Sequence, residues 1–296
     1  MDSTQNSSDT SRSLFILIPG FGRPHREHKI EILRTNLNII SLLYFTRLFH
    51  KVYITICLYD VDIDSGDEQV EFIQSVQSIL RDVQVKCPGF FEFHIPSAPG
   101  IVGQFMIRHA SPESLLELDA SIAYCMILLD DVEFNADEWT SNTWSRIFFD
   151  YHRHNLNILS PTMSLNSKYL FPYMLQRKYP ENVDTLSITS ACELFCYIMS
   201  FDTWCMYYKE LREEHPLLWG IDLVLTKHLG FRVGMIHYAT LRHHYQTVQH
   251  PYCEASIEAF RQMELYLSKF NETQQSLANQ PAILEDIHIY HRSKTT

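Results

Sequence analysis

The sequence contains no long uninterrupted apolar run, and this excludes a membrane-spanning helix of ordinary length. The first residues after Met1 are polar throughout, so no charged-then-apolar signal peptide is recognised there. Basic residues are in deficit, with 24 Lys and Arg against 35 Asp and Glu and a formal net charge of −11. Such a surface repels polyphosphate backbones, which disfavours nucleic acid as a partner. We therefore expect a cytoplasmic protein with no membrane span.

Cysteine pairs and several cofactor fingerprints are also missing. The seven cysteines form no CxxC pair and mostly fall inside apolar segments, which favours reduced thiols over a disulfide framework. The segment Gly20-Phe21-Gly22-Arg23 lacks the third glycine of a GxGxxG motif, so dinucleotide redox chemistry is disfavoured. No HExxH or paired Cys/His spacing indicates a zinc site.

Apolar strands and amphipathic helices alternate along the 296 residues. This order predicts an α/β fold, a single domain with a mainly parallel, doubly wound sheet flanked by helices. We expect a disordered leader at 1–13, the domain at 14–275 and a C-terminal tail at 276–296. Residues 166–184 are expected to form a less ordered segment that faces the substrate. Strands are expected at 14–18, 52–59, 90–95, 124–129, 157–163, 193–200 and 232–237, and helices at 30–48, 70–80, 102–109, 137–154, 202–211, 219–229 and 257–270.

An acidic run, Asp130-Asp131-Val132-Glu133, directly follows the most continuous apolar strand of the first half. In doubly wound sheets, ligands bind beyond the carboxyl ends of the strands. Crowded carboxylates repel one another there unless a cation lies among them. Their oxygens suit Mn²⁺ or Mg²⁺, which can bridge to a diphosphate, with Asp131 and Glu133 as metal ligands and Asp130 on the donor. An acidic turn that caps the next helix is the alternative.

Two other strand ends carry groups suited to a donor nucleotide. Pro19, Gly20 and Arg23 form a turn that can bring backbone N–H groups and a guanidinium towards a phosphate or a base. A plain β-turn explains the same residues equally well. Asp60, at the end of the second strand, is a candidate to hold a ribose or a base edge, although an isolated aspartate here is usually a turn residue.

The segment Trp219-Gly220-Ile221-Asp222 precedes a helical stripe and places Asp222 in the first helical turn. One interpretation is a helix-end charge favoured by the helix dipole. The other is a general base for a sugar hydroxyl, with Trp219 as the platform for a pyranose ring. His243-His244 follows the last strand of the predicted sheet, and an imidazole returning to this edge is a plausible third metal ligand.

These residues also resemble those of a known family. The segment YCMILLDDVEF resembles the DxD region of glycosyltransferases with the GT-A fold. The later segments CELFCYIMSFDTW and WGIDLVLTKHLGFRVGMIHYATLRHH are similar to a plant, algal and algal-virus family of GT-A-like proteins, long known as a domain of unknown function. That family shows an acidic residue before an apolar strand, an S-x-x-x-W, a W-G-[LI]-D helix start and a G-V-[IV] strand ending in His. The resemblance covers residues 14–245 and matches Glu193, Trp204, Trp219, Gly220, Asp222 and His243.

The resemblance implies a metal-dependent glycosyltransferase with a GT-A-like fold. A nucleotide-diphosphate sugar, expected to be a UDP-sugar, would be the donor, and a divalent cation would lie on its diphosphate. Asp222 would be the base of an inverting transfer, His243 a metal ligand, and Glu193, Trp219 and Gly220 would bind substrate. Because the usual D-x-D is replaced here, the metal pair is either Asp131 with Glu133 or centred on Asp130. A viral origin would place the enzyme in the host-cell cytoplasm.

Two alternatives remain open at this point. A metal-dependent phosphohydrolase or nucleotidyltransferase would use further carboxylates at other strand ends, where apart from Asp60 they are scarce. A catalytically silent carbohydrate-binding protein could share the fold, since a fold alone does not establish activity. The Tyr, Lys and Arg content of residues 168–178 suggests an aromatic, polar groove for a glycan or glycoprotein acceptor.

Overall fold

The computed structural model describes residues 12–22, 25–59, 67–98, 100–167, 172–177, 183–244, 254–278 and 283–290. Residues 1–11 of the leader expected at 1–13 fall outside these residues, whereas Arg12 is described and Ser13 begins the first strand. The strands are β1 Ser13–Phe21, β2 Lys51–Tyr59, β3 Phe91–His94, β4 Ser97–Ala98, β5 Ile122–Leu128, β6 Val132–Phe134, β7 Ile158–Met163, β8 Val183–Thr189, β9 Cys196–Ser200, β10 Val233–His243 and β11 Ile283–Tyr290.

Within the described residues these strands form one sheet in the order β11-β8-β10-β7-β9-β5-β1-β2-β3, with β4 beside β2 and β6 beside β10. The pairings of β1 with β2 and β5, of β2 with β3 and of β7 with β10 are parallel. The antiparallel pairings each involve β6, β8, β9 or β11. The predicted α/β class is confirmed, with a central sheet that is parallel around β1.

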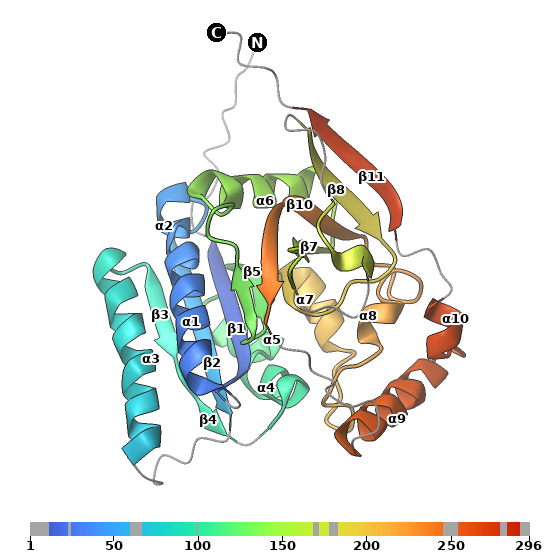
Figure 1. The fold of residues 1–296 in the computed structure, drawn as a ribbon, viewed down its shortest axis with the longest axis horizontal. Helices are drawn as coiled ribbons and strands as arrows, with labels where there is room; N and C mark the ends of the chain where they lie inside the picture. The colour runs from blue at the N-terminus through green and yellow to red at the C-terminus, as the bar shows by residue number, and fades with distance from the viewer. Residues whose placement is uncertain are drawn as a thin grey trace.

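The described helices are α1 Arg26–Ser41, α2 Leu43–Thr46, α3 Asp67–Lys86, α4 Val102–His109, α5 Pro112–Leu118, α6 Ser141–Arg153, η1 Pro172–Met174 (a 3₁₀ turn), α7 Phe201–Tyr208, α8 Ile221–Val224, α9 Glu254–Ser268 and α10 Gln274–Ala278. They cover both faces of the sheet (Figure 1), as right-handed crossovers on either side of β1 require. The helix α6 docks on α1 through Trp144, whose indole N–H donates to Ile39 O at 3.0 Å. Across the sheet, α7 docks on the end of α4, since Trp204 donates to Ala110 O at 2.8 Å.

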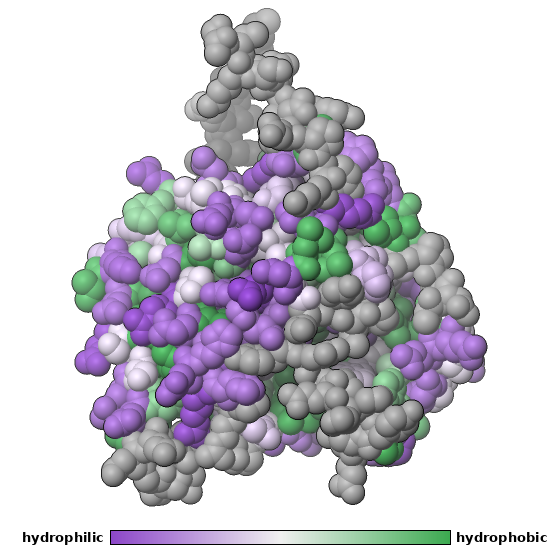
Figure 2. Space-filling view, in the orientation of Figure 1, coloured by the Kyte–Doolittle hydropathy of each residue, from purple (hydrophilic) through white to green (hydrophobic). Residues whose placement is uncertain are grey.

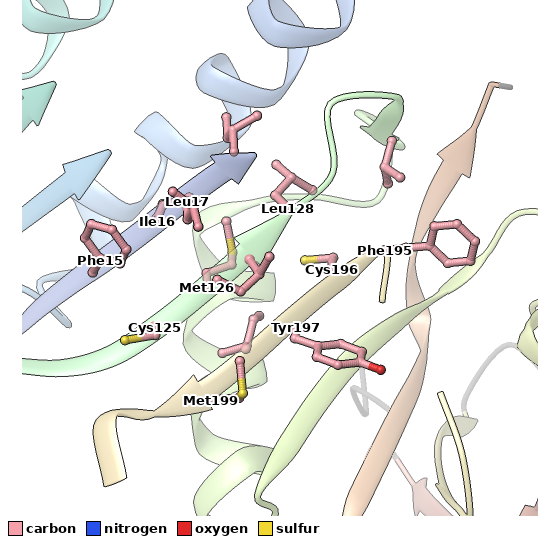
Figure 3. Packing of buried hydrophobic residues seen from close by; sticks show 14 of the residues in the cluster. Phe15, Ile16, Leu17, Cys125, Met126, Leu128, Phe195, Cys196, Tyr197 and Met199 are labelled. Carbon is pink, nitrogen blue, oxygen red and sulfur yellow. The ribbon is translucent and has the colours of Figure 1, made fainter. Parts of the chain in front are cut away.

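The core lies between these layers and along the central strands. Figure 3 shows side chains of β1, β5 and β9 packed side by side, among them Phe15, Met126 and Tyr197, all essentially inaccessible to solvent. Continuous apolar runs such as LFILI in β1 and CMIL in β5 are typical of strands buried on both faces. Polar side chains gather on the outer face over α1 and α3 (Figure 2), in keeping with the acidic composition. No helix in the described part of the chain is long and apolar enough to cross a membrane.

Several boundaries differ from those expected. β1 does not stop at Pro19: it continues to Phe21 through a register shift against β2, with Gly20 at φ 74°. The helix expected at 219–229 is only α8, because the residues after Val224 continue as irregular turns that end at Gly230, φ 70°.

The second half of the sheet contains strands that the sequence did not predict. β6 and β8 both pair with β10, which itself extends to His243 instead of ending at His237. Part of the stretch expected as a tail forms β11, which pairs with β8 from Val183 to Thr189. Residues 283–290 therefore belong to the domain, at the edge of its sheet (Figure 1).

Candidate active site

The acidic run forms the turn between β5 and β6, and its first carboxylate is tied to neighbouring elements. The ammonium group of Lys29, on α1, forms an ion pair with Asp130, and both side chains are largely buried. The backbone N–H of Gly22 donates to Asp130 Oδ2 at 3.3 Å, which joins the end of β1 to this turn. Burial raises the pKa of Asp130, Lys29 opposes the shift and Asp131 adds to it. The carboxylate of Asp130 is thus neutralised by Lys29 and hydrogen-bonded by Gly22.

Asp131 faces the end of β10. His243 Nε2 donates to Asp131 Oδ2 at 3.1 Å, and the imidazole is 4% exposed. The other carboxylate oxygen, Oδ1, is buried and has no hydrogen-bond partner among the described residues. An unpaired buried carboxylate oxygen is costly, so this atom has the capacity to accept a further donor or a cation.

Glu133 contacts a different imidazole. His244 Nε2 donates to Glu133 Oε2 at 2.7 Å, and the His28 ring packs edge-on against His244 with centroids 4.6 Å apart. Burial lowers the pKa of His244, while Glu133 opposes the shift. Neighbouring residues at the end of a strand point to opposite sides, so His243 and His244 engage separate carboxylates. The expected ligands Asp131, Glu133 and His243 are therefore not brought together as one set.

Among the described residues, no three His, Cys, Asp or Glu side chains converge as a cage for a metal ion. This does not conflict with Mn²⁺ or Mg²⁺, which proteins commonly bind through one or two carboxylates while substrate phosphates and water complete the shell. The buried, unpaired Oδ1 of Asp131, with His243 fixing the opposite oxygen, fits such a site.

Two residues of α1 that the sequence analysis did not single out hold the acidic turn in place. Lys29 pairs with Asp130, and Asn36 makes two buried hydrogen bonds to β6, from Nδ2 to Val132 O at 2.7 Å and from Phe134 N to Oδ1 at 2.9 Å. A signal was available, because both residues fall on the buried face of the helix with Leu33 and Leu37. A lysine and an asparagine on such a face require partners, which the sequence alone does not identify.

The donor-side residues expected at the first two strand ends are only partly described. Pro19 is buried in β1, and Gly20 is partly exposed, with a left-handed backbone that favours glycine. Arg23 and Asp60 lie outside the described residues. Gly22, two residues after Gly20, is the residue of this turn that the structure places against Asp130.

Asp222 lies in the first turn of α8, where its Oδ1 accepts the Gly220 N–H at 3.2 Å. Its side chain keeps some exposure, yet burial raises its pKa to about 6 against the opposing backbone hydrogen bonds. Trp219 is half-buried and meets the Phe260 ring edge-on at 5.3 Å between centroids. Gly220 was expected to allow close approach of a substrate; instead its missing Cβ leaves room for Met263 Cγ, which would be 2.9 Å away.

The loop between β8 and β9 contacts His243 near the acidic turn and lies in the electrostatic environment of Asp222. Phe195 packs on His243 with ring centroids 4.8 Å apart, and its carbonyl accepts the Leu129 N–H at the end of β5, at 3.0 Å. Glu193, two residues earlier, is 6% exposed. Burial raises the pKa of the Tyr173 hydroxyl, and Cys192, Asp222 and Glu193 add to that shift, so these groups share one electrostatic environment.

No protein-family model matches the chain, and no curated protein sequence matches it. Solved structures show distant similarity. S. aureus TarS residues 1–349 align over 90% of this chain and 67% of that chain, with 10% identity and a TM-score of 0.44. A197 from STIV aligns over 79% of this chain and 86% of that chain, with 11% identity and a TM-score of 0.37.

A UDP-glucose pyrophosphorylase complexed with UDP-glucose aligns over 88% of this chain and 99% of that chain, with 12% identity and a TM-score of 0.45. All three TM-scores are below 0.5, a level of similarity that establishes no common activity. The function of this chain must therefore be inferred from its own residues.

Proposed function

We propose that this protein uses a nucleotide-diphosphate sugar, with a UDP-sugar as the expected donor, and transfers the sugar to a glycan or glycoprotein in a reaction that needs Mn²⁺ or Mg²⁺. The observation that carries the proposal is the carboxylate of Asp131. One oxygen is fixed by His243, and the other is buried without a hydrogen-bond partner in the described part of the chain. It lies at the carboxyl end of β5, where ligands bind in sheets of this kind.

Asp131, with His243 beside it, would hold the cation. When bound, the cation would supply positive charge to the departing nucleotide diphosphate. The Lys29–Asp130 ion pair supports this division of labour, because Asp130 is paired with an ammonium group, whereas Asp131 is paired with an imidazole among the described residues. Gly22, fixed by its hydrogen bond to Asp130, would keep the end of β1 beside the donor.

Asp222 would act as the general base that takes the proton of the acceptor hydroxyl. Its pKa of about 6 leaves it mostly ionised at neutral pH while keeping it a better proton acceptor than an ordinary aspartate. The Gly220 N–H fixes one carboxylate oxygen, Oδ1, and so orients the group. A base on the face opposite the leaving group would invert the anomeric centre.

The test is a panel of nucleotide sugars scored by nucleotide release, with and without an acceptor glycan, in Mn²⁺ and in excess EDTA. The proposal expects release of nucleoside diphosphate that needs the cation and is stimulated by the acceptor. Release of nucleoside monophosphate and sugar phosphate would instead indicate a phosphohydrolase, and formation of nucleoside triphosphate when pyrophosphate is added would indicate a nucleotidyltransferase. Cation-independent sugar binding without turnover would indicate a silent carbohydrate-binding protein.

A further inference from the structure

A polar network, buried at Ser187 and His237 and partly exposed at Arg177 and Asp286, connects the C-terminal strand to the interior of the sheet. Asp286, on β11, accepts the Ser187 hydroxyl at Oδ1, 2.7 Å away, and Arg177 Nη1 at Oδ2, also 2.7 Å away. Arg177 Nη2 lies 3.3 Å from the Ser187 oxygen, and His237 Nε2 lies 2.8 Å from it. Ser187 is fully buried and His237 is 4% exposed.

This arrangement is not that of a hydrolytic Ser–His–Asp triad. In such a triad the carboxylate orients the imidazole, and the imidazole takes the serine proton. Here the serine donates its proton directly to Asp286, so its oxygen accepts the Nε2–H of His237. His237 Nδ1 accepts the backbone N–H of Arg177 at 3.1 Å, which leaves the ring no free site for another proton. Burial lowers the pKa of His237 to about 4, in accord with a neutral ring. The network therefore has a structural role and is not arranged for proton transfer.

What it holds is the short segment Pro172–Arg177. Gln176 N donates to Met163 O at 2.7 Å, and Gln176 Nε2 donates to His237 O at 3.0 Å. Leu175 forms a parallel bridge with Met163, so the segment runs along the end of β7 and contacts the middle of β10 at His237. Arg177 closes the attachment through its contacts to three strands, β8, β10 and β11.

At the start of this segment stands Tyr173, a half-buried residue packed against the core. Its hydroxyl has a pKa raised by burial and by the neighbouring Cys192, Asp222 and Glu193, so it is un-ionised at neutral pH. A phenol in that state can donate a hydrogen bond.

We infer that β11 is a clasp: Asp286, through Arg177, holds the segment Pro172–Arg177 in place and thereby positions Tyr173 on the acceptor side of the candidate active site. The inference rests on the proposed function for the role of Tyr173, whereas the clasp itself is a property of the fold. Asp286 is a positioning residue, and Tyr173 is the residue that would meet an acceptor hydroxyl.

Hydrogen exchange on the full chain tests the clasp. Asp286→Asn keeps the side-chain size and removes the charge that Arg177 pairs with. We expect the amides of Gln176 and Arg177 to exchange at least tenfold faster, while amides of β1 and β5 keep their protection. Glu285→Gln is the matched control, because Glu285 is the adjacent acid on β11 and pairs with Arg232 at 3.3 Å, away from this segment. If exchange of 172–177 is the same in both variants, the clasp does not exist.

Arg177→Lys provides a second variant that keeps the positive charge and the backbone N–H but loses the forked side chain. An intermediate rise in exchange is expected, and wild-type protection would contradict the clasp. The role of Tyr173 is measured with a UDP-sugar that the wild type turns over. Asp286→Asn and Tyr173→Phe should each lower kcat about tenfold without changing the donor Kd. Glu285→Gln should leave both kcat and the donor Kd unchanged. Unchanged kcat in Tyr173→Phe would overturn its role. Two results together would retain the clasp and reject the proposed function: faster exchange in Asp286→Asn, and a wild-type protein that releases no nucleotide from any donor.

Discussion

His243 donates to one oxygen of Asp131 at 3.1 Å and leaves the other oxygen of that carboxylate buried, with no hydrogen-bond partner in the described residues. The two residues are 112 positions apart, and the pairing of β6 with β10 brings them together. Fixing one oxygen orients the second, as outer hydrogen bonds orient carboxylates that bind metal ions. The predictions below follow from this asymmetry and from the environment of Asp222.

Asp131→Asn is expected to abolish turnover and to weaken donor binding in Mn²⁺, because the amide replaces the charged oxygen that faces the cation. The melting temperature should change little, since the amide oxygen can still accept from His243. Calorimetric titration of Mn²⁺ and a UDP-sugar, with thermal melting on the same sample, measures both effects. Glu133→Gln is the matched variant, and its loss should be smaller because Glu133 contacts His244. Equal losses would show that Glu133 also serves the cation.

His243→Ala is expected to lower the apparent Mn²⁺ affinity by about 10- to 100-fold, the usual effect of losing a partner that orients a metal ligand. His244→Ala should have a much smaller effect, because its imidazole contacts Glu133 and His28. The measurement is Mn²⁺-dependent donor binding in the two variants side by side. The opposite order, with His244 essential and His243 dispensable, would shift the assignment by one residue.

Gly220→Ala is expected to destabilise the fold more than Gly230→Ala. Both glycines have positive φ, 94° and 70°, so either alanine adds backbone strain of about 1–2 kcal/mol. Only at Gly220 would the new Cβ also meet packed atoms, 2.9 Å from Met263 Cγ, whereas Gly230 has open space. Urea unfolding of both variants gives the comparison. Equal free energies of unfolding in the two variants would mean that Met263 of α9 moves away from the new Cβ without a loss of stability.

Much of the parallel half of the fold was predictable, because its signals are local. The apolar runs of β2 and β5 and the helical spacing in α3 and α4 lie within single segments, and the structure has them close to where the sequence put them. β6, β8 and β11 escaped prediction because each is defined by its partner, and the pairs join residues far apart in the chain. β11 is also rich in polar side chains, as is common for an edge strand, and its sequence therefore predicted a C-terminal tail.

The candidate site divides in the same way. The acidic turn, Asp222 and His243 were found from strand ends and from the resemblance, both of which the sequence carries. The long-range pairings could not be found in this way. Lys29 pairs with Asp130 of the acidic turn across 101 residues, and Arg177 pairs with Asp286 of β11 across 109. Such pairings depend on the packing of α1 on β6 and of β11 on β8, which no local pattern specifies.

Asp222→Asn separates the two interpretations of this residue. As a general base, Asp222 contributes roughly a hundred- to ten-thousand-fold in rate, and its loss should lower kcat by that factor with donor affinity almost unchanged. A helix-end charge would instead be stabilising, and its removal would lower the melting temperature while turnover stayed near normal. The pKa of about 6, above the usual value of 3.8, favours the first interpretation, because burial disfavours the ionised form in the folded protein. A carboxyl with a raised pKa costs stability at any pH above that value, and the cost disappears as the pH falls towards 3.8.

At pH 8 we therefore expect Asp222→Asn to melt at the wild-type temperature or higher, since asparagine keeps an acceptor for the Gly220 N–H and carries no charge. The wild-type rate should fall as the pH drops through about 6, as the base takes up a proton, while the residual rate of the variant should lack that limb. Measuring kcat between pH 5 and pH 8 and the melting temperature on the same two samples checks all three statements, with full cation present throughout. An active variant that melts lower than the wild type would end the assignment of Asp222 as the base, because charge at a helix end would then account for everything the residue does.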